Sequence, residues 1–243
     1  MPTVLILGAG SDMAVAIARK FATEKYDIQL AGRNASVMTA LQNDLAIRYG
    51  VKTEALTFDA LDFASHGAFY NNLAVKPDIT ICVFGYLGDQ EKGQADWNEA
   101  ARILHTNYTG AVSILNVVAE DYAAKKQGLI VGISSVAGER GRQSNYLYGS
   151  AKAGFTAYLS GLRNRLFHTG VHVMSVQPGF VATRMTENLQ LPGILTAQPA
   201  QVANDIYKAV QKKKNTIYTK WFWRYIMLII RSVPEFMFKK LKL

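Results

Sequence analysis

Short apolar runs alternate with longer amphipathic segments along almost the whole chain. The first run, Thr3–Leu7 (TVLIL), is apolar and ends at a glycine, as is typical of a strand buried in a parallel sheet. The segment that follows places Ala14, Ile17, Ala18 and Phe21 on one face of a helix. Further strands are predicted at residues 28–31, 53–57, 79–84, 129–133, 172–176 and 216–218. Further helices are predicted at residues 35–49, 62–73, 97–126, 147–168 and 199–212.

This alternation indicates right-handed βαβ units and a parallel sheet covered by helices on both faces. The sequence therefore predicts an α/β fold, a Rossmann-type doubly wound parallel sheet of about seven strands. We expect this domain to occupy residues 1–218 and a basic amphipathic tail to occupy residues 219–243. A chain of 243 residues suits one such domain and is too short for two domains with a linker.

A glycine-containing turn joins the first predicted strand to the first predicted helix. It reads Gly8-Ala9-Gly10-Ser11-Asp12-Met13-Ala14. Glycine permits the tight turn, and the free N–H groups at the start of the helix attract the pyrophosphate of a dinucleotide. Asp12 is poorly placed beside a phosphate but can cap the helix. An ordinary turn without a ligand is the alternative interpretation.

The second predicted strand ends at Gly32-Arg33-Asn34, where an acidic residue would bind the ribose 2′-hydroxyl of NAD. An arginine at this place can instead pair with a 2′-phosphate. The sequence therefore favours NADP(H) as the cofactor, with NAD(H) as the second candidate. A surface arginine without a ligand is the alternative.

The strongest chemical signal is the string Tyr148-Gly149-Ser150-Ala151-Lys152. The i, i+4 spacing places Tyr148 and Lys152 on one helix face, where the lysine charge can lower the pKa of the phenol for general acid–base chemistry. Ser135 follows a predicted strand and emerges at the carboxyl edge of the sheet, where ligands bind in open α/β folds. The segment 178–183 (PGFVAT) ends the next strand at the same edge.

Together these motifs resemble those of the short-chain dehydrogenase/reductase family, over about residues 3–218. The resemblance implies that Tyr148 donates a proton to a substrate carbonyl oxygen while nicotinamide delivers hydride to the carbonyl carbon. It also implies that Lys152 holds the nicotinamide ribose and tunes Tyr148, and that Ser135 orients the carbonyl oxygen. Asn107 would hold a water in the proton relay to Lys152.

The same resemblance assigns the cofactor-binding residues. Asp59 matches a position that contacts adenine, and Thr183 matches one that contacts the carboxamide. The expected set is Gly8, Ser11, Asp12, Met13, Arg33, Asp59, Ala60, Gly85, Tyr148, Lys152, Pro178, Gly179, Val181 and Thr183. The chain departs from the family where Asp12 and Ala14 replace glycines, and where Cys82-Val83-Phe84-Gly85 replaces Asn-Asn-Ala-Gly. Both departures alter the walls of the cofactor pocket rather than the proton-transfer groups.

Several longer strings are similar to one subfamily, the decaprenylphosphoryl-2-keto-ribose reductases of mycobacterial cell-wall synthesis and related bacterial proteins. These strings are residues 58–62 (FDALD), 84–89 (FGYLGD), 107–109 (NYT), 134–140 (SSVAGER) and 223–228 (WRYIML). The resemblance implies reduction of the 2-keto group of a polyprenyl-phosphate-linked sugar, following oxidation by a flavin-dependent oxidase partner. It does not fix the sugar or the lipid.

The formal net charge of +9 is concentrated at one end of the chain. Residues 212–243 contain nine Lys and Arg and a single acid, Glu235. Lys220, Arg224 and Arg231 fall on one side of a helix, and aromatic and aliphatic residues fill the rest. This pattern is typical of an element lying on an anionic membrane. Packing over the substrate pocket and a homo-oligomer contact are the alternatives, and we see no nucleic-acid-binding motif.

Two further features lie near the predicted strand ends. Arg140, Arg142 and Arg184 are candidates to receive a substrate phosphate, with solvated loop arginines as the alternative. Residues 185–198, with Pro192-Gly193, have the composition of a mobile lid. The four histidines and the single cysteine show no metal-ligand spacing, so we expect no metal.

We therefore expect an NADP(H)-preferring reductase of a lipid-linked keto-sugar, cytoplasmic and peripheral on the inner membrane. No window reaches the ~18 uninterrupted apolar residues that a spanning helix needs. A soluble reductase of a small ketone or 3-oxoacyl substrate is the enzymatic alternative. A cofactor-binding scaffold in a membrane complex is the non-enzymatic one.

Overall fold

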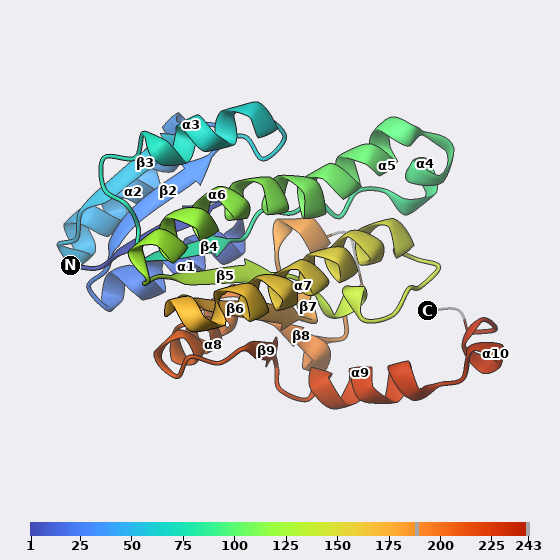
Figure 1. The fold of residues 1–243 in the computed structure, drawn as a ribbon. Coiled ribbons are helices and arrows are strands. Elements are labelled where there is room, and N and C mark those ends of the chain that lie inside the picture. The colour runs from blue at the N-terminus through green and yellow to red at the C-terminus, as the bar shows by residue number, and fades with distance from the viewer. Residues whose placement is uncertain (188–189, 242–243) are drawn as a thin grey trace.

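The computed structural model describes residues 1–187 and 190–241. Its main sheet contains seven parallel strands in the order β3-β2-β1-β4-β5-β6-β9 (Figure 1). These strands are β1 (Thr3–Leu7), β2 (Asp27–Gly32), β3 (Thr53–Thr57), β4 (Ile79–Cys82), β5 (Leu129–Ile133), β6 (His172–Pro178) and β9 (Thr216–Thr219). The order reverses between β1 and β4, and in such folds ligands bind outside the carboxyl ends of the strands at this point. The predicted doubly wound α/β fold is confirmed.

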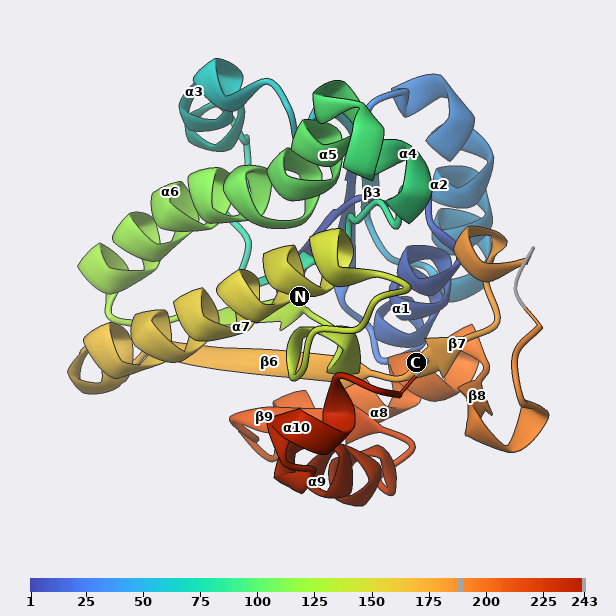
Figure 2. The same cartoon turned by 90° about the vertical axis from the view of Figure 1, so that its right-hand side faces the viewer.

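Helices cover both faces of the sheet (Figures 1 and 2). One face carries α1 (Asp12–Thr23), α2 (Ala35–Tyr49) and α8 (Pro199–Gln211). The other carries α3 (His66–Asn71), α6 (Gly110–Lys125) and α7 (Tyr146–Leu166). Val4 and Ile6 of β1 belong to the first core, and Leu5 and Leu7 belong to the second. Because successive side chains of a strand point to opposite faces, a strand covered on both faces is apolar throughout.

The helical stretch predicted at residues 97–126 is confirmed, and it differs from one regular α-helix only in its middle. The chain forms α5 (Trp97–Leu104), then a π-helical turn (His105–Thr109), and only then α6. The side-chain amide of Asn107 donates to the carbonyl oxygen of Ile103 at 2.8 Å, inside this turn. A side chain that inserts into the backbone ladder accounts for the widened turn.

Two shorter helices also differ from the prediction. Residues 62–73 form a 3₁₀ turn (Phe63–Ser65) and α3 rather than one helix. The helix α4 (Gln90–Ala95) was not predicted from the hydrophobic pattern. Asp89 caps α4 by accepting a hydrogen bond from the Lys92 N–H at 3.0 Å, so a local capping residue defines this helix.

The end of the chain packs against the edge of the sheet formed by β6 and β9. After β9, the chain forms α9 (Trp223–Ser232) and α10 (Glu235–Phe238), which lie beneath the sheet in Figure 1. Trp223 and Met227 of α9 are buried against Val136, which follows β5. None of the helices in the described ranges is both long enough and apolar enough to cross a membrane.

The segment predicted as a lid, residues 185–198, lies between two short strands. β7 (Phe180–Val181) pairs in parallel with β8 (Thr196–Ala197). Between them the structure describes 3₁₀ turns at Arg184–Thr186 and Gly193–Leu195. Residues 188–189 of the predicted lid lie outside the described residues.

Candidate active site

The structure brings Tyr148, Lys152, Asn107 and Ser135 together at the carboxyl ends of β4 and β5. The Lys152 ammonium lies 5.7 Å from the centre of the Tyr148 ring, as their spacing on α7 predicts. A Cβ added to Gly85, which follows β4, would lie 3.0 Å from Asn107 Oδ1 and 3.6 Å from Lys152 Nζ. A side chain at Gly85 would therefore crowd the space between these polar groups.

Tyr148 lies in the first turn of α7 and is partly exposed. Burial of the phenol raises the pKa of Tyr148 to about 12, and a hydrogen bond with the Ser135 side chain acts in the opposite direction. The expected lowering of this pKa by Lys152 is therefore wrong for this structure, because desolvation dominates. A raised pKa keeps the phenol protonated at neutral pH, which is the form that a proton donor needs.

Lys152 is buried, and its ammonium donates to the carbonyl oxygen of Ile133 at 2.9 Å. Burial lowers the pKa of Lys152 to about 8. A neighbouring hydroxyl pair fixes the backbone here: the side chain of Ser134 donates to the Lys152 carbonyl oxygen at 3.0 Å and lies 2.6 Å from Thr156 Oγ1. The lysine is thus a poorly solvated cation aimed at the end of β5.

Asn107 is buried and uses its whole amide group. Its NH₂ group donates to the carbonyl oxygens of Tyr86 at 2.6 Å and Ile103 at 2.8 Å, and its oxygen accepts from the Tyr86 N–H at 3.1 Å. The π-helical turn is thereby tied to the loop after β4. This arrangement orients the Asn107 oxygen toward Gly85 and Lys152.

The glycine-containing turn after β1 has the form of an anion site. Gly8 has φ +95°, and a Cβ there would overlap the backbone of Phe84, so this position requires glycine. Beside Gly10, no atom lies within 4 Å of an added Cβ. Ser11 caps α1 by accepting from the Ala14 N–H at 3.2 Å, while the N–H groups before Ala14 have no partner inside the helix. The turn, with Ser11 and Met13, therefore fits a dinucleotide pyrophosphate.

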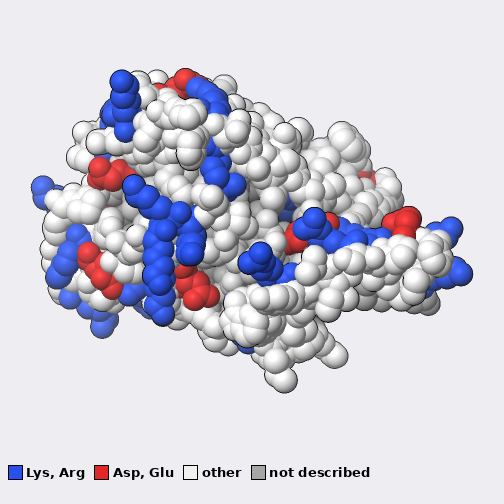
Figure 3. Space-filling model, turned by 60° about the horizontal axis from the view of Figure 1, so that its bottom comes forward, with Lys and Arg blue, Asp and Glu red and all other residues white. Residues whose placement is uncertain are grey.

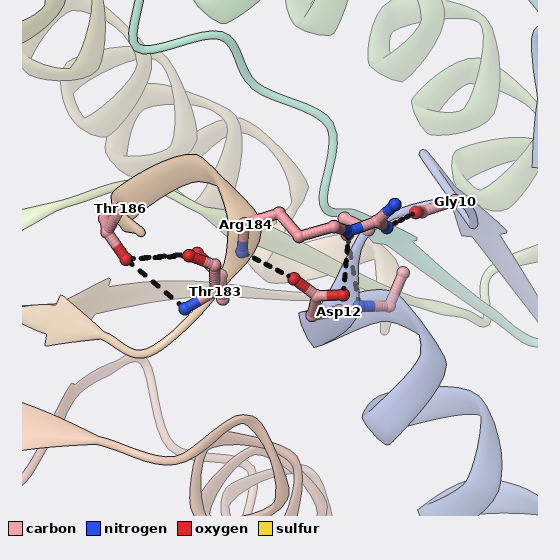
Figure 4. Close-up of polar contacts among 7 residues, drawn as sticks. Gly10, Asp12, Thr183, Arg184 and Thr186 are labelled. Carbon is pink, nitrogen blue, oxygen red and sulfur yellow. Dashed lines mark hydrogen bonds and ion pairs between the residues drawn. The ribbon is translucent and has the colours of Figure 1, made fainter. Parts of the chain in front are cut away.

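Asp12 begins α1 and does not act as its cap. It is instead paired with Arg184, whose Nε lies 3.1 Å from Asp12 Oδ1 (Figure 4). Reasoning from the sequence missed this pair, because 172 positions separate the residues and neither position signals the other. A cavity of about 520 Å³ lies beside the pair, with Thr183, Glu187 and Leu191 also in its wall.

The remaining predicted cofactor residues lie along the same edge of the sheet. Arg33 is exposed at the end of β2. After β3, the Asp59 carboxylate accepts from the Leu61 N–H at 2.9 Å, which shapes the loop that contains Ala60. After β6, a Cβ on Gly179 would overlap the indole of Trp223, so the Pro178-Gly179 bend packs on α9. Val181 and Thr183 continue from this bend.

Two of the three arginines considered for a substrate phosphate hold the end of the chain instead. Arg140 donates to the carbonyl oxygens of Ile230 at 2.8 Å and Arg231 at 3.1 Å, at the carboxyl end of α9. Arg142 contacts Met227 Sδ at 3.3 Å. Both arginines therefore anchor the tail on the loop after β5.

Comparison with known proteins agrees with this geometry. Residues 2–192 match the family model described as short chain dehydrogenase. The chain is 34% identical over 241 residues to an uncharacterized oxidoreductase of Mycobacterium tuberculosis, covering 98% of this chain and 96% of that protein. It is 30% identical over 224 residues to the ketoacyl reductase HetN of Nostoc, covering 88% and 77%. Its fold is similar to that of a Sphingobium yanoikuyae short-chain dehydrogenase in complex with NADPH, with a TM-score of 0.80, 22% identity and 97% coverage of each chain.

Proposed function

The chain belongs to the short-chain dehydrogenase/reductase family of NAD(P)-dependent oxidoreductases, which act on CH–OH groups, and from this premise we propose that it reduces a ketone to a secondary alcohol. The observation that supports the proposal is the convergence of Tyr148, Ser135, Lys152 and Asn107 at the carboxyl edge of the sheet. These residues provide an acid, a hydrogen-bond donor, a cation and a fixed amide. A bound nicotinamide would supply the hydride.

The roles of the four residues follow from their chemistry. Tyr148 donates its proton to the carbonyl oxygen as negative charge develops there, and Ser135 donates a hydrogen bond to the same oxygen. Lys152 stabilises the resulting phenolate with its charge. Asn107 is held rigidly by Tyr86 and Ile103, so its oxygen can fix a water through which Lys152 returns the proton to Tyr148.

NADPH is the proposed cofactor. Arg33 is exposed at the end of β2, where its guanidinium can form charge-assisted hydrogen bonds with a 2′-phosphate. The solved relative from Sphingobium was obtained with NADPH, which supports the same choice. NADH would lack the group that Arg33 binds.

Substitution of the acid tests the activity directly. Tyr148→Phe should lower kcat for ketone reduction by about 10²–10⁴-fold, because the proton donor is removed. The Kd for NADPH, followed by nicotinamide fluorescence, should stay within threefold of the wild-type value. Wild-type turnover in Tyr148→Phe would contradict the mechanism. If this variant also fully complements a deletion strain, a cofactor-binding scaffold becomes the better description.

We propose further that the ketone belongs to a lipid-linked sugar, such as a polyprenyl-phosphate pentose. The support comes from an exposed apolar surface on the tail, which we call the α9–α10 ridge. Its residues are Trp221, Tyr225, Leu228, Ile229, Phe236, Met237 and Leu241, each between 48% and 73% exposed. On a helix that covers a protein core, the solvent face is normally polar, so an outward row of Trp, Tyr, Leu and Ile indicates contact with an apolar environment.

Charge favours an anionic bilayer as this environment. Lys220, Arg224, Arg231, Lys239 and Lys240 alternate with the ridge residues along the chain. Figure 3 shows groups of Lys and Arg side chains on this side of the molecule. The single acid in the segment, Glu235, is paired with Arg140 at 2.9 Å. Two copies of the ridge packed face to face would bring like charges together, whereas anionic headgroups would complement them.

The ridge also adjoins the loop near the active site. Lys220 donates to the Ile194 carbonyl oxygen at 2.5 Å, and the Trp223 indole donates to the Leu195 carbonyl oxygen at 3.2 Å. The Ile194 side chain is 82% exposed. A membrane that contacts the ridge would therefore meet the segment between β7 and β8, which borders the cofactor turn.

Vesicle flotation tests the membrane contact. Wild type should float with vesicles of phosphatidylglycerol and phosphatidylcholine, and not with phosphatidylcholine alone. Leu228→Ser with Ile229→Ser should abolish flotation, whereas Val37→Ser with Ile47→Ser, at positions on α2 that are at least as exposed, should not. If the wild type is recovered equally in the soluble fraction with and without vesicles, membrane docking is excluded. That result would favour a soluble reductase of a small ketone or 3-oxoacyl substrate.

Lipid analysis tests the substrate class. In a deletion strain, mass spectrometry of prenyl-phosphate lipids should reveal a keto-sugar lipid lighter by two hydrogens than its reduced product. An oxidase of secondary alcohols, such as a flavin-dependent enzyme, would have to supply this ketone. Unchanged prenyl-phosphate lipids would contradict the substrate assignment while leaving ketone reduction intact.

A further inference from the structure

The cofactor turn contains a charge that an anion site should not contain. Asp12 is the first residue of α1, next to the helix end that fits a pyrophosphate. A carboxylate there would repel the phosphates, because the two groups carry like charges at close range. Retention of NADPH binding therefore requires that something cancel this charge.

Arg184 is placed to do so. Its backbone N–H donates to Asp12 Oδ2 at 2.8 Å, its Nε donates to Asp12 Oδ1 at 3.1 Å, and its Nη2 donates to the Gly10 carbonyl oxygen at 2.6 Å (Figure 4). The arginine therefore contacts both the acid and the backbone of the turn. A guanidinium has five N–H donors, so these two side-chain bonds leave others for a phosphate oxygen.

The position of Arg184 is fixed by hydrogen bonds within the turn that contains it. Thr186 Oγ1 donates to the Val181 carbonyl oxygen at 2.6 Å, and the Thr183 N–H donates to Thr186 Oγ1 at 3.3 Å. This capped 3₁₀ turn directs Arg184 across to α1. The cavity of about 520 Å³ has both Asp12 and Arg184 in its wall.

We propose that Asp12 and Arg184 form one charge-compensated unit of the pyrophosphate site, in which Arg184 neutralises Asp12 and binds a phosphate oxygen. Arg184 is thereby a cofactor-binding residue, and its importance depends on the presence of Asp12. An ion pair that served folding alone would contribute little, because both side chains are substantially exposed. This inference rests on the proposed use of NADPH.

A double-mutant cycle on the Kd for NADPH, measured by fluorescence titration at low salt, tests the unit. Arg184→Gln should weaken NADPH binding by 10- to 100-fold, because it leaves the Asp12 carboxylate beside the phosphates. Asp12→Asn should bind at least as tightly as wild type. The double variant should bind more tightly than Arg184→Gln by at least fivefold, which a merely structural role of Arg184 would not produce.

Two controls separate the possible outcomes. Adenosine 2′-monophosphate lacks a pyrophosphate, so its Kd should stay within twofold for all three variants, and their thermal unfolding should match wild type within 2 °C. A Kd for Arg184→Gln within twofold of wild type, or a double variant as weak as Arg184→Gln, would overturn the inference. If wild type itself does not bind NADPH, the proposed function fails. If wild type binds NADPH normally and the Kd is the same in all three variants, only the Asp12–Arg184 unit is refuted.

Discussion

The ammonium of Lys152 donates a 2.9 Å hydrogen bond to the carbonyl oxygen of Ile133, the last residue of β5. This single bond joins the catalytic helix α7 to the strand after which Ser135 emerges. It satisfies one of three ammonium donors and leaves the charge otherwise poorly solvated. Burial accordingly lowers the pKa of Lys152 to about 8.

We predict that Lys152→Met abolishes reduction and stabilises the fold at pH 7. The folded-state pKa of Lys152 is lower than that of an unfolded lysine, so its charge costs stability below pH 8. This cost disappears as pH rises from about 8 to about 10.5. Removing the charge should therefore raise the free energy of unfolding by about 1–3 kcal/mol at pH 7, less the lost hydrogen bond.

Denaturant unfolding at pH 7 and pH 10.5 measures this effect. The advantage of Lys152→Met should shrink toward zero at the higher pH, whereas Lys212→Met, at an exposed position, should change stability at neither pH. A variant less stable than wild type at pH 7 would show that the hydrogen bond to Ile133 outweighs the desolvation of the charge.

We also predict an alkaline limit to ketone reduction. Tyr148, with a pKa of about 12, keeps its proton throughout the working range, whereas Lys152 loses its charge above about pH 8. The kcat/KM for the ketone, at saturating NADPH, should therefore be level below pH 7 and fall about tenfold per pH unit well above pH 8. The Kd for NADPH over the same range distinguishes loss of chemistry from loss of binding. A profile that stays level to pH 10 would contradict the role given to the lysine.

Cofactor preference should depend on Arg33. Replacement by alanine should weaken NADPH binding by about 10- to 100-fold, because the 2′-phosphate loses a charge-assisted partner. Binding of NADH, which has no phosphate at this position, should change less than threefold. If the affinities for NADPH and NADH fall equally, Arg33 shapes the turn after β2 rather than binding the 2′-phosphate.

The strands and helices that have a regular pattern of apolar residues could be predicted from the sequence. β1 (Thr3–Leu7) and α2 (Ala35–Tyr49) begin and end at the residues predicted from the apolar pattern. The i, i+4 spacing placed Tyr148 and Lys152 on one face because both lie in a single regular helix. Local rules suffice wherever the determining contacts are local.

The remainder depends on contacts between distant residues. The π-helical turn at Asn107 is tied to Tyr86 in the loop after β4, and hydrophobic periodicity carries no information about such hydrogen bonds. The Asp12–Arg184 pair joins the start of α1 to a turn 172 positions further along the chain. The pKa of Tyr148 was predicted in the wrong direction because its sign depends on how deeply the phenol is buried.

The attachment of the tail supplies the last prediction. Arg140 donates to three carbonyl oxygens at the end of α9, those of Ile230, Arg231 and Val233, and pairs with Glu235. The carbonyl groups in the last turn of a helix have no partners within the helix. A cation at this end also interacts favourably with the negative end of the helix dipole. We expect Arg140→Ala to release the last turn of α9 together with α10 while the sheet stays folded. Limited trypsin digestion should then cleave after Arg231 at least tenfold faster than in wild type.

Arg165→Ala provides the matched control, because Arg165 of α7 forms an exposed ion pair with Glu120 of α6. Its digestion rate should equal that of wild type. Because Trp223 and Met227 remain buried against Val136, amide exchange in the first turn of α9 should rise less than in its last turn. Uniform exchange along α9, or no change in digestion, would show that apolar packing alone holds the tail in place.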